Sequence, residues 1–123
     1  MGRIARRLFV VAGLVLAVGQ ACISPPLPLP PPAEPEVTAT GEEGMVLLSG
    51  HVPQPRAWVS ARNLSRIDTG DTRAIGGDRA DERGDYAFEI RGYPGDYCVL
   101  WYEYADDESQ TRDFEIPDPV PGP

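Results

Sequence analysis

From residue 45 to residue 116, hydrophobic and polar residues alternate with a period of two, and no helical period persists. Alternation of this kind is typical of strands that bury one face. We therefore expect an antiparallel all-β domain without helices. The clearest strands are predicted over residues 46–52, 57–61, 86–90 and 97–102, with a last strand over 111–116 and a short one around 72–75.

Glycine and proline mark the turns between these strands. The segment 81–85 contains Gly84 at a position that favours a positive φ angle, and the segment 93–96, which contains Gly95, is expected to form a second turn. A third turn is expected at the acidic residues 106–109. Short strands at this spacing predict a small antiparallel Greek-key β-sandwich.

The alternation also predicts which side chains form the core. On the expected inner faces are Val46, Leu48, Val52, Ala57, Val59, Ala61, Tyr86, Phe88, Ile90, Tyr97, Val99 and Trp101. On the expected outer faces are three aromatic residues, Trp58, Tyr102 and Tyr104. Exposed aromatic side chains on a flat sheet can stack on sugar rings or anchor a protein partner, although they can also pair across strands.

The N-terminal segment differs from the rest in composition. Arg3, Arg6 and Arg7 precede an uncharged apolar run over residues 8–18, which is too short to span a bilayer. A basic region followed by a short apolar run predicts a cleaved signal peptide over residues 1–21. The Arg6–Arg7 pair leaves both general secretory and twin-arginine export open.

The apolar run ends in Val18-Gly19-Gln20-Ala21-Cys22, which resembles the lipobox of bacterial lipoproteins. The resemblance implies cleavage before Cys22 and its acylation, and therefore a membrane partner through a lipid anchor. Ile23 is not the aspartate that favours inner-membrane retention, so the outer membrane is favoured. The alternative is ordinary signal cleavage that leaves Cys22 as a free thiol, able to pair with Cys98 or with another chain.

Proline makes up more than half of residues 24–35. Such a segment stays extended and solvated, so we predict a proline-rich linker over residues 22–44 that reaches roughly 70 Å. The folded domain is then expected over residues 45–118, followed by a short tail over 119–123.

Charge limits the classes of partner. The chain has 11 basic residues and 19 acidic ones, and every basic residue is an arginine. Removal of residues 1–21 would leave 8 arginines and a net charge near −11. Nucleic acid is excluded as a partner because phosphate binding needs a basic face. An envelope protein or a glycan remains as the expected partner.

Four short sequence motifs occur in order along the predicted domain. They are Gly50-His51-Val52, Ala57-Trp58-Val59, the segment 81–88 with Gly84, Tyr86 and Phe88, and the segment 93–97. Together they resemble the carboxypeptidase regulatory-like domain family. The resemblance covers residues 46–116 and implies a transthyretin-like (prealbumin-like) β-sandwich. In that family the peptidase activity belongs to a separate zinc domain, which these residues do not match.

No enzyme or cofactor is predicted. A catalytic zinc site needs several nitrogen or carboxylate ligands, and the chain has one histidine, His51, on an outer face. Cys98 has no recognisable base to activate it. The acidic turns do not follow an EF-hand pattern, which leaves a weak calcium site only as an alternative. The sequence thus predicts a non-catalytic, lipid-anchored envelope protein, periplasmic or surface-facing, with a sugar-binding module as the alternative.

Overall fold

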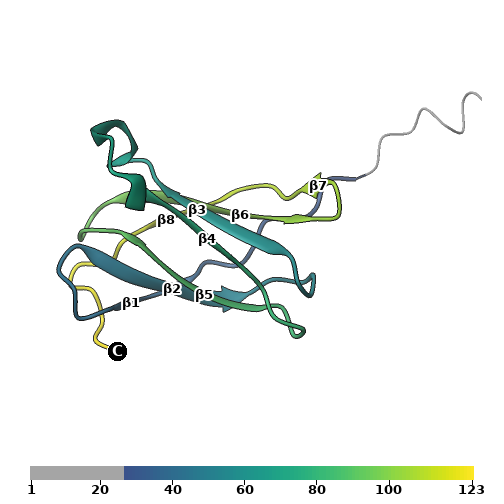
Figure 1. The fold of residues 1–123 in the computed structure, drawn as a ribbon, viewed down its shortest axis with the longest axis horizontal. Coiled ribbons are helices and arrows are strands. Elements are labelled where there is room, and N and C mark those ends of the chain that lie inside the picture. Colours follow the sequence, from purple (N-terminus) through teal and green to yellow (C-terminus); the bar gives the residue numbers. More distant parts are fainter. Residues whose placement is uncertain (1–26) are drawn as a thin grey trace, which may run out of the picture.

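The computed structural model describes residues 27–123, so the predicted signal peptide (1–21) and Cys22 lie outside the described residues. The predicted fold class is confirmed: two antiparallel sheets pack face to face (Figure 1). The first sheet has the order β1-β2-β5, with β1 (Glu36–Ala39), β2 (Met45–His51) and β5 (Asp85–Arg91). The second has the order β4-β3-β6-β7, with β4 (Ile75–Arg79), β3 (Trp58–Asn63), β6 (Tyr97–Tyr104) and β7 (Asp107–Glu108), and β8 (Arg112–Glu115) also pairs with β6.

Residues 27–123 contain no α-helix. Two short 3₁₀ turns, η1 (Ile67–Thr69) and η2 (Thr72–Ala74), follow β3. The short strand expected around residues 72–75 therefore begins later, because η2 occupies its first part and β4 starts at Ile75. Within this described part of the chain, no helix has the length and apolar character needed to cross a membrane.

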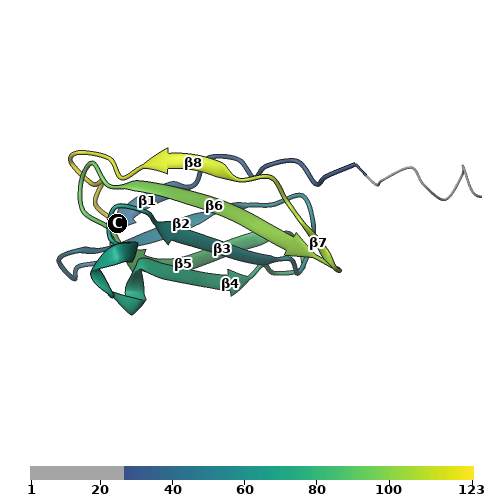
Figure 2. The same ribbon diagram turned by 90° about the horizontal axis from the view of Figure 1, so that it is seen from above.

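The core lies between the two sheets. Figure 2, seen from above, shows the strands of the second sheet lying over those of the first. Strands β2 and β5 contribute Leu48 and Ile90, which are completely buried, and the second sheet contributes Val59 and Leu100. The predicted inner faces of β2, β3 and β5 are confirmed by this burial. Each such side chain contributes about 1.5–3 kcal/mol through its removal from water.

The two predicted glycine turns are also present. Gly84 has a φ of +88° and Gly95 a φ of +86°, a region that glycine adopts without steric cost. At Gly84 a side chain would also collide with the carbonyl oxygen of Val52. The turn thereby brings the loop after β2 against the start of β5.

The folded domain extends beyond both of its predicted boundaries, which corrects the predicted linker over 22–44. Strand β1 pairs in register with β2, from Glu36 opposite Ser49 to Ala39 opposite Val46. The reason is that an extended segment can be an edge strand as well as a solvated spacer, and Val37 buries its side chain in the core.

Contacts continue on the N-terminal side of β1 and into the predicted tail. Pro32 is fully buried, and its carbonyl oxygen accepts a 2.9 Å hydrogen bond from Nε of Arg112. Leu29 forms an isolated parallel β-bridge with Ser109, the residue after β7. At the opposite end of the sandwich, the amide of Ala39 donates to the carbonyl oxygen of Pro121 over 2.8 Å.

The predicted orientation of β6 is wrong. Cys98, Leu100 and Tyr102 point into the core with no exposed surface, whereas Tyr97 is 41% exposed on the outer face. Both faces of this strand carry apolar side chains, so alternation alone does not distinguish the inner face from the outer one. Tyr102 is therefore a core residue rather than an exposed aromatic.

Candidate functional site

An open groove at one end of the second sheet is the best candidate for a binding site. It has a volume of about 440 Å³ and is lined by Arg56, Trp58, Arg79, Glu103, Tyr104 and Ala105. This volume lies within the range of small-molecule sites in proteins. The groove brings together two of the three aromatic residues singled out in the sequence.

The register of the sheet explains why these residues meet. Trp58 is the first residue of β3, and it is paired with Arg79 at the end of β4 on one side and with Glu103 of β6 on the other. Directly paired residues of neighbouring strands point to the same face of a sheet. Arg79, Trp58 and Glu103 thus form one row across the outer face, with the indole between a cation and an anion.

Trp58 lies against the sheet surface instead of projecting away from it. A Cβ atom added to Gly77 of β4 would be 3.3 Å from Nε1 of the indole, so the glycine leaves room for the ring. The Trp58 residue is nevertheless 43% exposed. An aromatic side chain supported by the sheet and open to solvent can serve as a flat contact surface.

The charged side chains of the groove differ in how they are paired. Nη2 of Arg56 donates to Oε1 of Glu82 over 2.8 Å, so the charge of Arg56 has a partner. Nη1 of Arg79 donates to the backbone carbonyl of Arg56 over 3.4 Å. None of the ion pairs within residues 27–123 includes Arg79 or Glu103. These two side chains therefore keep their charges available to a ligand.

Of the other two aromatic residues predicted to face outward, only Tyr104 is exposed and could contact a ligand. Tyr104 is 44% exposed and lines the groove at the end of β6. Tyr102 is completely buried, and its hydroxyl has no hydrogen-bond partner in the described chain. Burial raises the pKa of this hydroxyl, since ionisation would place a charge in the core.

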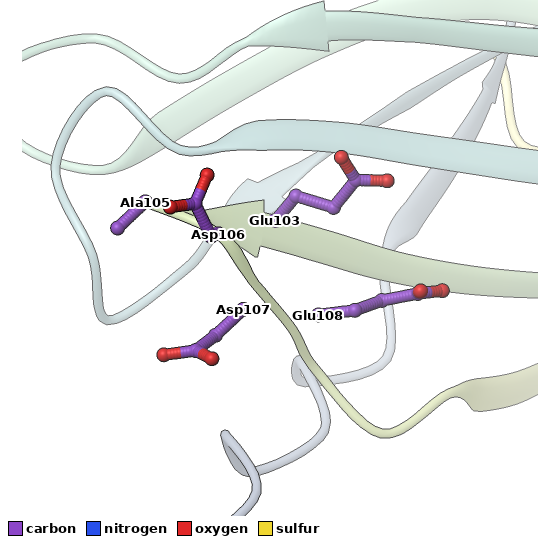
Figure 3. Close-up of a pocket in the computed structure, with 5 residues that line it drawn as sticks. All are labelled: Glu103, Ala105, Asp106, Asp107 and Glu108. Carbon is purple, nitrogen blue, oxygen red and sulfur yellow. The ribbon is translucent and has the colours of Figure 1, made fainter.

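A second, smaller hollow borders the groove at the turn between β6 and β7. It has a volume of about 310 Å³ and is lined by Glu103, Ala105, Asp106, Asp107 and Glu108. Figure 3 shows that the carboxylates point in different directions instead of converging. Across residues 27–123, no group of three or more His, Cys, Asp or Glu side chains is placed to hold a metal ion. The hollow therefore places a group of negative charges beside the groove, and the described residues form no metal site there.

The other two candidates for chemistry, His51 and Cys98, are paired with a carboxylate and buried in the core, respectively. His51 is exposed, and its Nδ1 lies 3.0 Å from Oδ1 of Asp85 on the neighbouring strand. Cys98 is buried, and burial, with a smaller effect of Asp96, raises the pKa of its thiol to about 12. A thiol with this pKa stays protonated at neutral pH and is a poor nucleophile.

Far from the groove, a buried polar cluster links the end of β3 to the turn before β6. Nδ2 of Asn63 donates to Oδ2 of Asp96 over 2.8 Å and to the carbonyl oxygen of Arg91 over 2.8 Å. Arg66 donates from Nε to the same Asp96 oxygen over 3.1 Å, and its guanidinium lies 4.6 Å from the centre of the Tyr93 ring. The side-chain hydrogen bonds of Asn63 and Arg66 converge on Asp96, so the polar groups satisfy one another and we assign this cluster to stability.

Sequence reasoning identified Trp58 and Tyr104 but missed Arg79 and Glu103. The missing signal was strand pairing, because these residues join Trp58 only through the register of β4 and β6.

In comparisons with known proteins, no family model, no curated protein and no solved structure matched the chain. The groove must therefore be interpreted from its own chemistry.

Proposed function

We propose that this chain is a lipid-anchored protein of the bacterial envelope whose β-sandwich is a non-catalytic binding module. The observation that carries the proposal is the order of residues before the domain: three arginines, a short apolar run, and Ala21-Cys22. This order suits cleavage before Cys22 and acylation of its side chain, and more than one acyl chain is needed for stable anchoring.

The structure refines this proposal by shortening the spacer. Among residues 27–123, Leu29 is the first with a backbone partner in the sandwich, and six residues, 23–28, separate it from Cys22 in the sequence. Such a segment can reach at most about 25 Å. An anchored domain would therefore lie close to the lipid surface, with the β7 end and the groove nearest to it.

A binding role is favoured over catalysis by the surroundings of the reactive side chains. The one histidine pairs with an exposed aspartate, and the thiol of Cys98 is buried with a raised pKa. An activated nucleophile needs a base within hydrogen-bond reach, and the side-chain hydrogen bond of His51 goes to Asp85, not to a serine, threonine or cysteine. We further propose that the domain is of the carboxypeptidase regulatory-like type, which is supported by the two antiparallel sheets and by the glycine turns at Gly84 and Gly95.

Metabolic labelling with an alkyne analogue of palmitate tests the anchor. The chain is expressed in a bacterial host in three forms, wild type, Cys22→Ala and Cys98→Ala, and the cells are fractionated. We expect label in the membrane fraction for wild type and for Cys98→Ala. The Cys22→Ala variant should lose the label. Wild-type protein that is exported but unlabelled would contradict the proposal.

The second candidate function, sugar binding, is favoured by the groove itself. Trp58 supplies an exposed aromatic surface, and Arg79 and Glu103 lie on either side of it without ion-pair partners in the described chain. The two candidates are compatible, since an anchored domain can bind a glycan of the envelope.

A further inference from the structure

We propose that the groove binds a neutral pyranose sugar, with Trp58 under the ring and with Arg79 and Glu103 bonded to its hydroxyl groups. This inference rests on the proposed binding role of the domain and specifies its ligand. It depends on the row formed by these three residues across β4, β3 and β6.

The shape of the row suits a flat ring. Nε1 of the Trp58 indole lies beside Gly77 of β4, and the Trp58 residue is 43% exposed, so part of its surface remains open to a ligand. The C–H face of a pyranose is apolar, and its hydroxyl groups project from the rim. A ring placed on the indole would direct its hydroxyls toward the neighbouring strands, where the two charged side chains lie.

The two charged groups match hydroxyls in complementary ways. A guanidinium only donates hydrogen bonds and a carboxylate only accepts them, whereas a hydroxyl does both. Arg79 can therefore donate to one hydroxyl oxygen while Glu103 accepts from another. Hydrogen bonds to charged partners are stronger than those between neutral groups, and they give a site orientation and specificity.

The charges around the groove favour a neutral sugar over an acidic one. A sugar carboxylate could pair with Arg79, but it would lie beside Glu103 and the acidic turn formed by Asp106, Asp107 and Glu108. Arg56 offsets little of this negative charge, since its own charge is paired with Glu82. Like charges at such a site repel, and the acidic chain as a whole repels polyanions at longer range.

The test uses the full chain in a Trp101→Phe background, purified from the cell fraction that contains it, membrane or soluble, and kept in a detergent without a sugar headgroup. Trp101 is the only other tryptophan, so the fluorescence then reports on Trp58 alone. The probes are cellohexaose, laminarihexaose and chitohexaose as neutral ligands, and hexagalacturonate as the charged counterpart. Each is titrated up to millimolar concentration, and calorimetry gives an independent affinity.

We expect at least one neutral hexasaccharide to bind and hexagalacturonate to bind at least about tenfold more weakly. In calorimetry, Trp58→Ala and Glu103→Gln should each weaken binding by about tenfold or more. The matched control is Tyr97→Ala, which removes a similarly exposed aromatic from the other end of β6 and should leave affinity within about twofold. Near-ultraviolet circular dichroism confirms that each variant is folded.

Three results would overturn the inference: no neutral probe binds, Trp58→Ala in its folded state binds as well as wild type, or hexagalacturonate binds as tightly as the neutral probes. None of these results bears on the lipid anchor, because palmitate labelling measures acylation of Cys22 independently of sugar binding. Failure of sugar binding and failure of anchoring are thus separate outcomes.

Discussion

Asn63, the last residue of β3, donates from Nδ2 to Oδ2 of Asp96 in the turn before β6, and the two atoms are 2.8 Å apart. Asn63 is fully buried and Asp96 is 5% exposed. Arg66 and the backbone amide of Tyr93 donate to the same carboxylate. One side chain therefore joins the end of a central strand, the loop after it and the turn that leads back into the sheet.

Replacing Asp96 by alanine should lower the free energy of unfolding by about 3 kcal/mol, because the donors of Asn63 and Arg66 lose their buried acceptor. Urea unfolding measures this loss. The control is Asp68→Ala in η1, which removes an exposed carboxylate and should change stability by less than about 0.5 kcal/mol. Equal effects of the two substitutions would show that the cluster does not stabilise the fold.

The stabilising effect of Asp96 should also depend on pH. Burial acts to raise the pKa of this carboxyl, but hydrogen bonds from Arg66, Asn63 and the Tyr93 amide outweigh burial and hold the pKa below its ordinary value. A carboxyl with a lowered folded-state pKa stabilises the protein above its unfolded-state pKa of about 3.9. That contribution is lost as the pH falls through the folded-state pKa.

The measurement compares urea midpoints of wild type and Asp96→Asn from about pH 7 to about pH 2, a range that extends below the unfolded-state pKa. The stability difference should be constant at neutral pH and should shrink below about pH 4, where protonation removes the charge from wild type. A difference that stays constant down to the lowest pH would mean that Asp96 is not a charged acceptor in the folded protein.

Gly84 and Gly70 provide a matched pair for the turn argument. Both have positive φ angles, +88° and +78°, but only at Gly84 would a Cβ atom collide with backbone, at the carbonyl oxygen of Val52. Gly70→Ala should therefore cost only about 1 kcal/mol, from the left-handed conformation. Gly84→Ala should cost at least about 2 kcal/mol more, measured as a shift in urea midpoint. Similar costs would contradict the close approach at Val52.

The presence of strand β1 predicts that substitutions before residue 45, the expected start of the domain, affect stability. Val37 buries its side chain against the core, so Val37→Ala should lower the free energy of unfolding by about 2 kcal/mol. The neighbouring Glu36 is exposed, and Glu36→Ala should have little effect. A solvated linker would make both substitutions neutral, and that result would remove β1 from the fold.

The sequence predicted most of the sandwich because β2, β3 and β5 each have one clearly apolar face. Strand β6 was misoriented, since Tyr97, Val99 and Trp101 are as apolar as Cys98, Leu100 and Tyr102. Pairing resolves the choice: Tyr102 lies opposite Val59, and Leu100 lies opposite Ala61, both inner residues of β3.

The remaining features depend on contacts between distant parts of the chain. Asn63 and Asp96 are 33 positions apart, and the row of Arg79, Trp58 and Glu103 exists only once β4 and β6 flank β3. Local alternation contains no information about either. The edge strand β1 was obscured by the prolines before it, although Val37 and Thr38 are residues that favour strands.

The intact mass of the protein purified from bacterial membranes tests the central claim most directly. We expect a polypeptide that begins at Cys22, with the added mass of covalently bound lipid on this residue, and a Cys22→Ala variant without that addition. A wild-type mass that retains residues 1–21, or that begins at Cys22 without lipid, would contradict an anchored envelope protein.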